Sequence, residues 1–259
     1  MSQVILQNKI QKDYSIFKSR VDGSISSVTQ DMIQWITKID NCAFYNCETL
    51  TSIQIPNSVT DIKSYAFYGC SSLTNVTIPN SVITIGNNAF ENSGLTNIVI
   101  PNSITSMGNS VFYYCHSLES VTLSNNLTTI PQSIFSACNK LTNITVPEGI
   151  TSIGAYAFSA CSSLTNLTIP STVTSIGDGA FQVFSDPQRI ITLLSVTPPT
   201  ITSLGPFNCP TNNVTIYVPA ESLDTYKSGS MWAAYASKIQ AIPSWHLRFL
   251  WYNGDTTPH

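Results

Sequence analysis

The sequence predicts a repeat solenoid built mainly of short β-strands, and two regularities carry that prediction. A phenylalanine recurs every 23 residues, with one interval of 22, and a leucine follows it in step. A fixed period in the twenties is typical of proteins whose units cannot bury their apolar side chains alone and stack on their neighbours. The recurring residues are Phe44, Phe67, Phe90, Phe112, Phe135, Phe158 and Phe181, then Leu50, Leu73, Leu95, Leu118, Leu141 and Leu164.

Each unit predicts two strands and a turn. In the segment Leu50–Ile55, apolar and polar residues alternate, and Pro56 ends the strand because proline cannot donate to a ladder. The segment Val59–Ile62 places two apolar residues three positions apart and predicts a second strand. An A-F-x-x-C motif then predicts a short 3₁₀ or single helical turn. Glycine follows the second strand in several units, where we expect it to permit a sharp corner; these are Gly86, Gly108, Gly154 and Gly177.

One unit is a residue shorter than the others. The residue is missing between Phe90 and Leu95, where Ser93 also replaces the recurring cysteine. Because deletions are tolerated in connecting loops, we expect the strands on either side to stay in register.

These recurring positions resemble the BspA-like, or Treponema-type, leucine-rich repeat family. The resemblance spans Ile25 to Ile242 and rests on leucine, paired isoleucines, proline, glycine, Ala-Phe and cysteine recurring together. It implies a curved, right-handed leucine-rich repeat solenoid with a parallel sheet of L-x-x-I-x-I-P strands. Members are typically surface or secreted proteins of anaerobic gut and oral bacteria, some protists and their phages, and several resemble adhesins.

The pattern divides the chain into four parts. Residues 1–40 are expected to form an N-terminal cap and half-unit, and residues 41–184 the solenoid. Residues 185–243 are expected to hold degenerate repeats and a C-terminal cap, and residues 244–259 an aromatic tail. Caps are needed because an uncovered last unit would expose its apolar face and its strand edge.

The C-terminal cap is expected to combine strands with a helical segment. Arg189–Leu194 and Val214–Val218 read as two more strands. The helical segment follows them and is broken by Gly229; its apolar residues at near-helical spacing are Leu223, Tyr226, Trp232, Tyr235 and Ile239.

The tail is rich in aromatic residues and has the period of a strand. Its residues Trp245, Leu247, Phe249 and Trp251 alternate with His246, Arg248, Leu250 and Tyr252. Two interpretations stay open for it. The strand either covers the end of the solenoid, or it docks onto another subunit or a larger assembly.

Composition excludes several classes of partner. Charged residues make up 10% of the chain and the net charge is -3, so there is no basic stripe for nucleic acid. No apolar run reaches the roughly 18 residues of a membrane span, so membrane insertion is not expected. The first residues lack the apolar stretch and cleavage site of a secretion signal. The surface is expected to be a neutral coat of Ser, Thr and Asn.

No catalytic, metal or cofactor site is predicted. The chain has 3 His and 7 Cys, and its acidic residues are scattered over different repeat positions. Five cysteines occupy one repeat position, so with units about 4.8 Å apart they form a column rather than converge on a metal. We expect them to be small buried side chains, with disulfides between adjacent units as the alternative. These are Cys47, Cys70, Cys115, Cys138 and Cys161.

The candidate binding residues form two polar columns on the outer side of the first strand of each unit. A structural role is the alternative, because Thr favours strands and an Asn column can hydrogen-bond between units. Tyr45, Tyr68, Tyr113 and Tyr114 break the neutral coat, either as recognition anchors or as inert turn residues. The predicted binding residues are Gln54, Asn75, Thr77, Asn97, Thr122, Asn143, Thr145, Asn166 and Thr168.

Together these features predict a non-enzymatic binding or adhesion module for a protein or glycan, located at the cell surface or outside the cell. The alternative is a virion-associated structural component, such as a phage or appendage decoration protein, which residues 244–259 dock into an oligomer or larger assembly.

Overall fold

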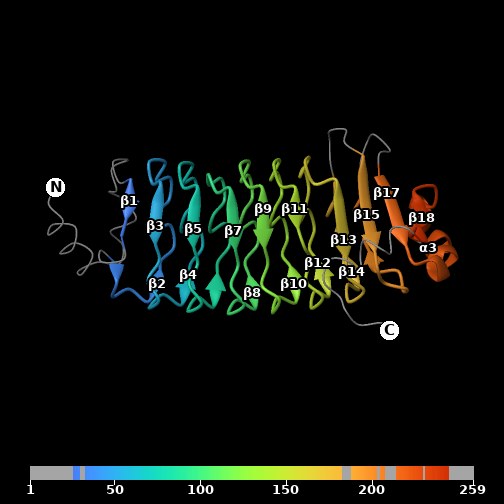
Figure 1. Cartoon of the computed structure of the whole chain (residues 1–259), viewed down its shortest axis with the longest axis horizontal. Helices are drawn as coiled ribbons and strands as arrows, with labels where there is room; N and C mark the ends of the chain where they lie inside the picture. The colour runs from blue at the N-terminus through green and yellow to red at the C-terminus, as the bar shows by residue number, and fades with distance from the viewer. Residues whose placement is uncertain are drawn as a thin grey trace.

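The computed structural model describes residues 26–29, 33–182, 188–202, 205–207, 214–229 and 231–244. In these residues the chain forms a parallel-strand β-solenoid, as predicted, in which each turn of chain contributes strands to two faces. Figure 1 shows the turns side by side along the long axis of the molecule. The first 25 residues of the N-terminal cap predicted for residues 1–40, and the tail strand beyond residue 244, lie outside the described residues.

The first face holds the strands predicted from the L-x-x-I-x-I motif. These strands are β1 (Ser27–Val28), β3 (Ser52–Gln54), β5 (Asn75–Thr77), β7 (Asn97–Val99), β9 (Ser120–Thr122), β11 (Asn143–Ile144), β13 (Asn166–Ile169), β15 (Arg189–Leu193), β17 (Val214–Val218) and β18 (Ile239–Ala241). They form three parallel sheets, β1-β3-β5, β7-β9-β11 and β13-β15-β17-β18, in which Ser52, for example, lies opposite Asn75 and Ile53 opposite Val76.

The second face holds two-residue strands from the second segment of each unit, as predicted. They pair with one another in the same way, with Asp61 opposite Thr84. These strands are β2 (Lys38–Ile39), β4 (Asp61–Ile62), β6 (Thr84–Ile85), β8 (Ser106–Met107), β10 (Thr129–Ile130), β12 (Ser152–Ile153), β14 (Ser175–Ile176) and β16 (Thr200–Ile201).

The short unit keeps its register on both faces, although one ladder is weakened. On the second face β6 and β8 stay paired, with Thr84 opposite Ser106. On the first face β5 and β7 belong to different sheets, but Thr96 still donates its backbone N–H to the Thr74 carbonyl at 3.1 Å, as Thr142 does to Glu119 between the paired β9 and β11, so the expected register is kept. Gly94 closes the shortened loop, where an added Cβ would lie 2.1 Å from the carbonyl oxygen of Ser71. Only glycine fits so close to the neighbouring backbone.

The second face is interrupted between β8 and β10 for a chemical reason. In other units the residue after the second strand donates its N–H to the preceding turn, as Gly108 does to the Ile85 carbonyl at 2.8 Å. Pro131 occupies this position after β10 and has no N–H to donate. The ladder resumes one turn later, where Gly154 donates to the Ile130 carbonyl.

The glycines after the second strands are needed for space, not for backbone freedom as expected. Gly86, Gly108, Gly154 and Gly177 do not adopt the left-handed conformation. An added Cβ on Gly108 would instead lie 2.4 Å from the backbone nitrogen of Asn87 in the preceding turn. Adjacent turns therefore approach each other closely at this corner.

The turn around each phenylalanine is not a 3₁₀ or helical turn, so that prediction is wrong. Two residues in each turn, such as Tyr65 and Gly69 around Phe67, have positive φ of 59° and 69°. This geometry aims alternate N–H groups at the next turn of the solenoid. Phe67 accordingly donates to the Ala89 carbonyl at 2.7 Å and Gly69 to the Glu91 carbonyl at 2.8 Å. We call this third hydrogen-bonded side, formed by the six or so residues around each phenylalanine, the turn face.

The core is a stack of identical side chains from successive turns. The phenylalanine rings from Phe44 to Phe207 are buried and stacked, with centroids 5.0 Å apart for Phe67 and Phe90 and 5.8 Å for Phe158 and Phe181. The buried cysteine column lies beside it, and the Cys138 thiol donates to the carbonyl oxygen of Phe112 at 3.1 Å. Residues at the same position of the sequence repeat therefore lie in a column along the solenoid.

The C-terminal end combines strands and helices largely as predicted. After η2 (Ala220–Ser222), the helix α3 (Leu223–Ser228) ends at Gly229, and η3 (Trp232–Tyr235) follows. The Trp232 indole donates to the Pro199 carbonyl at 2.8 Å. Ile239 does not continue the helical segment as expected; it lies in β18, which pairs with β17. In the described residues no helix combines the length and apolar character needed to span a membrane. The four-part division of the chain stays a prediction.

Candidate functional site

The nine predicted binding residues lie on the outer side of the first face. Eight of them are exposed and Thr168 is half-buried, while the intervening Ile53, Val76 and Ile98 point into the core. The alternation predicted from the sequence is therefore confirmed for these strands. Whether the exposed side chains bind a partner is a separate question.

The strand register arranges the polar residues in two columns. Gln54 lies opposite Thr77, and Asn97 lies opposite Ser120, which lies opposite Asn143. The columns change character at the C-terminal side, where Asn166 pairs with the half-buried Ile190 and Thr168 with the buried Thr192. The neutral polar surface thus ends at β13.

Threonine hydroxyls elsewhere in the fold are used to join the turns. Each donates to a carbonyl oxygen of the preceding turn, as Thr151 does to Thr128 at 3.1 Å. The threonines that do so are Thr51, Thr60, Thr96, Thr142, Thr151, Thr172, Thr174 and Thr200. The recurrence of threonine at these positions of the repeat therefore has a structural explanation.

The outward threonines of the first face differ from these. Among the described residues, the hydroxyls of Thr77, Thr122, Thr145 and Thr168 take part in no hydrogen bond within the protein. In the asparagine column, one bond joins neighbouring turns, from the Ser120 hydroxyl to the Asn97 amide oxygen at 2.5 Å. Hydrogen bonding between turns therefore accounts for little of this surface, which keeps donors and acceptors available to a ligand.

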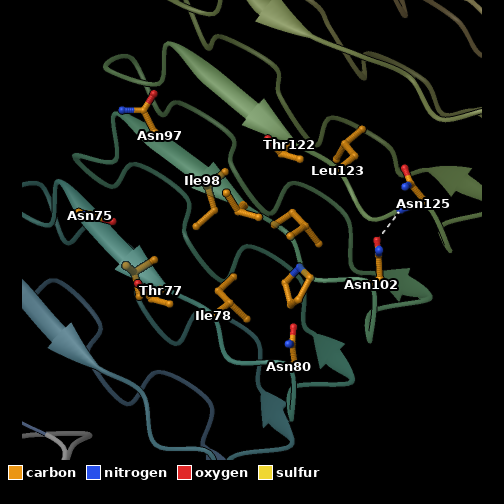
Figure 2. Close-up of a pocket in the computed structure, with 14 residues that line it drawn as sticks. Asn75, Thr77, Ile78, Asn80, Asn97, Ile98, Asn102, Thr122, Leu123 and Asn125 are labelled. Atoms are coloured by element: carbon orange, nitrogen blue, oxygen red, sulfur yellow. Dashed lines mark hydrogen bonds between the residues drawn. The ribbon is translucent and has the colours of Figure 1, made fainter. Parts of the chain in front are cut away.

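A cavity of about 510 Å³ opens on this surface across β5, β7 and β9. It includes four of the predicted residues, Asn75, Thr77, Asn97 and Thr122, and lies where the ladder between β5 and β7 is interrupted. Figure 2 shows Asn75 and Asn97 at the start of their strands at one end of the cavity. Sequence reasoning found these residues but not the hollow that joins them.

The other end of the cavity is formed by three amides that sequence reasoning missed. Asn80, Asn102 and Asn125 follow the ends of the strands, as Figure 2 shows. The backbone N–H of Asn125 donates to the Asn102 side-chain oxygen at 2.9 Å, which fixes the orientation of that amide. The recurring residue after the strand-ending proline was the available signal, because Asn80 follows Pro79 and Asn102 follows Pro101.

The centre of the cavity is apolar. Val99 replaces the threonine of other turns and is 61% exposed, between the side chains of Thr77 and Thr122. All residues that line the cavity are uncharged. The arrangement of an apolar centre between two groups of amides suits a neutral ligand that offers both hydrogen-bonding and apolar groups.

The cysteine column has the environment of structural thiols. Burial raises the pKa of Cys70 and Cys161 to about 12 and that of Cys115 to about 11. The six cysteines that the structure describes are free thiols, and Ser93 occupies the cysteine position of the short unit and contacts the Cys115 sulfur at 3.3 Å. In the described part of the chain no group of three or more His, Cys, Asp or Glu side chains could hold a metal.

The repeated turns and the buried leucine, isoleucine and phenylalanine columns define a protein of the leucine-rich repeat class. The family model for the BspA type leucine rich repeat region matches residues 37–161 and 128–229, with six copies. These matches cover more than half of the chain, which therefore belongs to the BspA-type leucine-rich repeat family. No curated protein matches the sequence.

Two solved structures of bacterial leucine-rich repeat proteins are similar to the chain, and the first of them supports the fold. A leucine-rich repeat protein from Bacteroides ovatus ATCC 8483 matches with a TM-score of 0.52 and 20% identity over 84% of this chain. A leucine rich cell surface protein from Faecalibacterium prausnitzii A2-165 matches with a TM-score of 0.43 and 23% identity over 81% of this chain. The chain covers 66% and 62% of these two proteins, which is less than two thirds of their length. At these identities the likeness concerns the fold alone.

Proposed function

We propose that the chain is a non-enzymatic binding or adhesion module that holds a protein or glycan partner on its first face. The observation that carries this proposal is the uncharged cavity on β5, β7 and β9, in which an apolar centre lies between two groups of amides. Leucine-rich repeat solenoids offer a long regular surface, and such surfaces commonly serve binding.

The chemistry of the surface favours a neutral partner. The outward threonine hydroxyls are unused by the fold, and no charged residue lines the cavity. A charged ligand group placed there would lose hydration without gaining an opposite charge. A hydroxyl-rich or amide-rich ligand, such as a glycan or an extended peptide, would exchange its bonds to water for bonds to Asn and Thr side chains.

We place the module at the cell surface or outside the cell, as members of the family typically are. The alternative of a virion-associated decoration protein depends on docking through residues 244–259. Nearly all of that segment lies outside the described residues, so the structure offers no observation that favours it.

Binding to a glycan and extracellular-matrix array with the purified chain tests the proposal. We expect at least one neutral glycan or matrix protein to bind, and Thr122→Arg to abolish binding because the new side chain fills the cavity beside Val99.

Thr129→Arg is the matched control, since Thr129 is an exposed threonine on a short strand of the second face. We expect it to bind as the unchanged chain does, with both variants keeping the same circular dichroism spectrum. A blank array, or equal loss of binding in the two variants, would contradict a binding role for the first face.

A further inference from the structure

A second surface, on the turn face, carries a different chemistry. The residue after each phenylalanine forms a column that reads Tyr45, Tyr68, Glu91 and Tyr113 in successive turns. Hydrogen bonds fix this order, because Gly69 donates its N–H to the Glu91 carbonyl, and Asn92 donates to the Tyr113 carbonyl, each at 2.8 Å. Glu91 is thus the single carboxylate in a column of phenol rings.

The tyrosines on each side of Glu91 form two ring clusters. On one side Tyr45 and Tyr68 stack with centroids 4.6 Å apart and an interplanar angle of 5°, and Tyr65 approaches Tyr68 at 6.0 Å. On the other side Tyr113 and Tyr114 lie 4.2 Å apart. His116 extends this second cluster, with its ring 5.3 Å from that of Tyr114.

Three of these rings are exposed at the surface, and the other two, Tyr68 and Tyr113, are half-buried. Tyr45, Tyr65 and Tyr114 are 46%, 39% and 43% exposed, although rings of this size usually lose much of their exposure on folding. The adjacent phenylalanines already fill the core, so the tyrosines are not needed to complete it.

The carboxylate between the clusters has no cationic partner in the described residues. Glu91 is half-buried and accepts a hydrogen bond from the Asn88 amide at 2.5 Å. The ion pair found among the described residues joins Lys63 and Asp61 and does not involve Glu91. Burial raises the pKa of Glu91, and the Glu91 charge is the largest cause that raises the pKa of Tyr68. A partly desolvated negative charge among electron-rich ring faces is a cost that a bound cation would relieve.

We infer that the turn face around Glu91 binds a cationic side chain, an arginine of a protein partner. Tyr68 and Tyr113 are attached one turn before and one turn after Glu91, each about 4.8 Å away along the solenoid, a spacing below the roughly 6 Å over which cation–π attraction acts. The planar guanidinium can stack on a phenol ring while it donates to the carboxylate, which an ammonium group does less well.

Other ligand classes fit this surface less well. An anion would be repelled by the Glu91 carboxylate, and a neutral sugar would leave its charge uncompensated. The surface is formed by the turns around the phenylalanines, whereas the cavity is formed by the strands of the first face. The inference therefore stands apart from the proposed function of the first face.

The test measures binding of N-acetyl-arginine methylamide to the full chain by NMR, with ¹³C-labelled tyrosine rings as reporters. We expect saturable shifts of the Tyr68 and Tyr113 resonances at pH 7. N-acetyl-citrulline methylamide, which has nearly the same shape without the charge, should bind at least about fivefold more weakly, in line with the size of cation–π and ion-pair contributions.

Two variants and their controls separate this site from a general attraction to a negatively charged protein. Glu91→Gln keeps an acceptor for Asn88 and should weaken arginine binding at least about fivefold. Glu119→Gln removes an exposed carboxylate beside β9 and should leave it unchanged. Tyr68→Leu should weaken binding, whereas Tyr156→Leu, which alters an exposed tyrosine of a more distant turn, should not.

Equal binding of the arginine and citrulline probes, or equal affinities for wild type and Glu91→Gln, would overturn the inference. Thr122→Arg on the first face should leave arginine binding intact, so failure of one surface can be told from failure of the other.

Discussion

The phenylalanine column makes a quantitative prediction about how stability is distributed along the solenoid. Phe112 is fully buried and stacked on Phe90 and Phe135, with both centroid distances 5.7 Å. Phe112→Leu keeps an apolar side chain but removes two ring contacts, each worth roughly 0.5–1.5 kcal/mol beyond the area it buries. With a repacking cost of up to about 1.5 kcal/mol, we expect the free energy of unfolding to fall by about 1–4.5 kcal/mol.

A double-mutant cycle isolates the ring contact from the loss of volume. Phe112→Leu and Phe135→Leu each remove the same contact, so the pair should show a coupling of about 0.5–1.5 kcal/mol. Phe112→Leu and Phe158→Leu share no contact, because Phe135 lies between them, and should be additive within about 0.5 kcal/mol. Matched substitutions thus differ only in the number of turns between them.

Urea unfolding followed by circular dichroism gives the required free energies, provided that the dependence on urea is the same for all variants. The nearest-neighbour account of the core is refuted by equal coupling for the adjacent and the separated pair, or by additivity of the adjacent pair.

Three further predictions concern the corner, the surface and the thiols. Gly108→Ala should destabilise the fold by about 1–3 kcal/mol in the same assay, because its Cβ would lie 2.4 Å from the Asn87 nitrogen, whereas Gly149→Ala, with its nearest contact at 3.2 Å, should cost less. Hydrogen bonds from the hydroxyls of Thr84 and Thr60 lower the pKa of Asp61 to about 2. The pKa of Asp61 in the unfolded chain is about 4. The ionised carboxylate therefore stabilises the folded chain fully above pH 4, and this stabilisation is lost as the pH falls through 2. The thermal midpoint of wild type should exceed that of Asp61→Asn at pH 6. A difference between the two midpoints that is as large at pH 2 as at pH 6 would contradict this. Iodoacetamide at pH 8 should leave the buried thiols unmodified in the folded chain and label them in urea, as read by mass spectrometry; these are Cys47, Cys70, Cys115, Cys138 and Cys161.

The solenoid and its columns could be predicted because stacking turns a repeated sequence position into a line in space. Ile53 and Gln54 already show which side of the strand is buried, and the strand register then carries that pattern to every turn. The same logic placed the predicted binding residues on one face. It could not reveal the cavity, which depends on a missing ladder and on amides beyond the strand ends.

The turn face escaped prediction for a related reason. Its left-handed positions hold Asn or Gly in some units, such as Asn88 and Gly69, but Tyr65 and Ala137 in others, so no residue type that favours positive φ recurs there. Their conformation is imposed by the hydrogen bonds to the next turn, which are not a property of the local sequence. The interruption of the second face between β8 and β10 could have been predicted from the sequence, because Pro131 lacks the N–H that other units donate at this position.

The short unit gathers the departures from the repeat that matter most for both proposed surfaces. It brings Glu91 into the tyrosine column and Val99 into the threonine column, and β7 of this unit is separated from the ladder of β5. The fold does not require a carboxylate or a valine at these two positions, since other turns have Tyr or Ser in place of Glu91 and Thr in place of Val99. The cavity and the carboxylate lie on different sides of one turn, so a partner that used both would have to wrap around it. Separate effects of Thr122→Arg and Glu91→Gln would instead show that the two surfaces act independently.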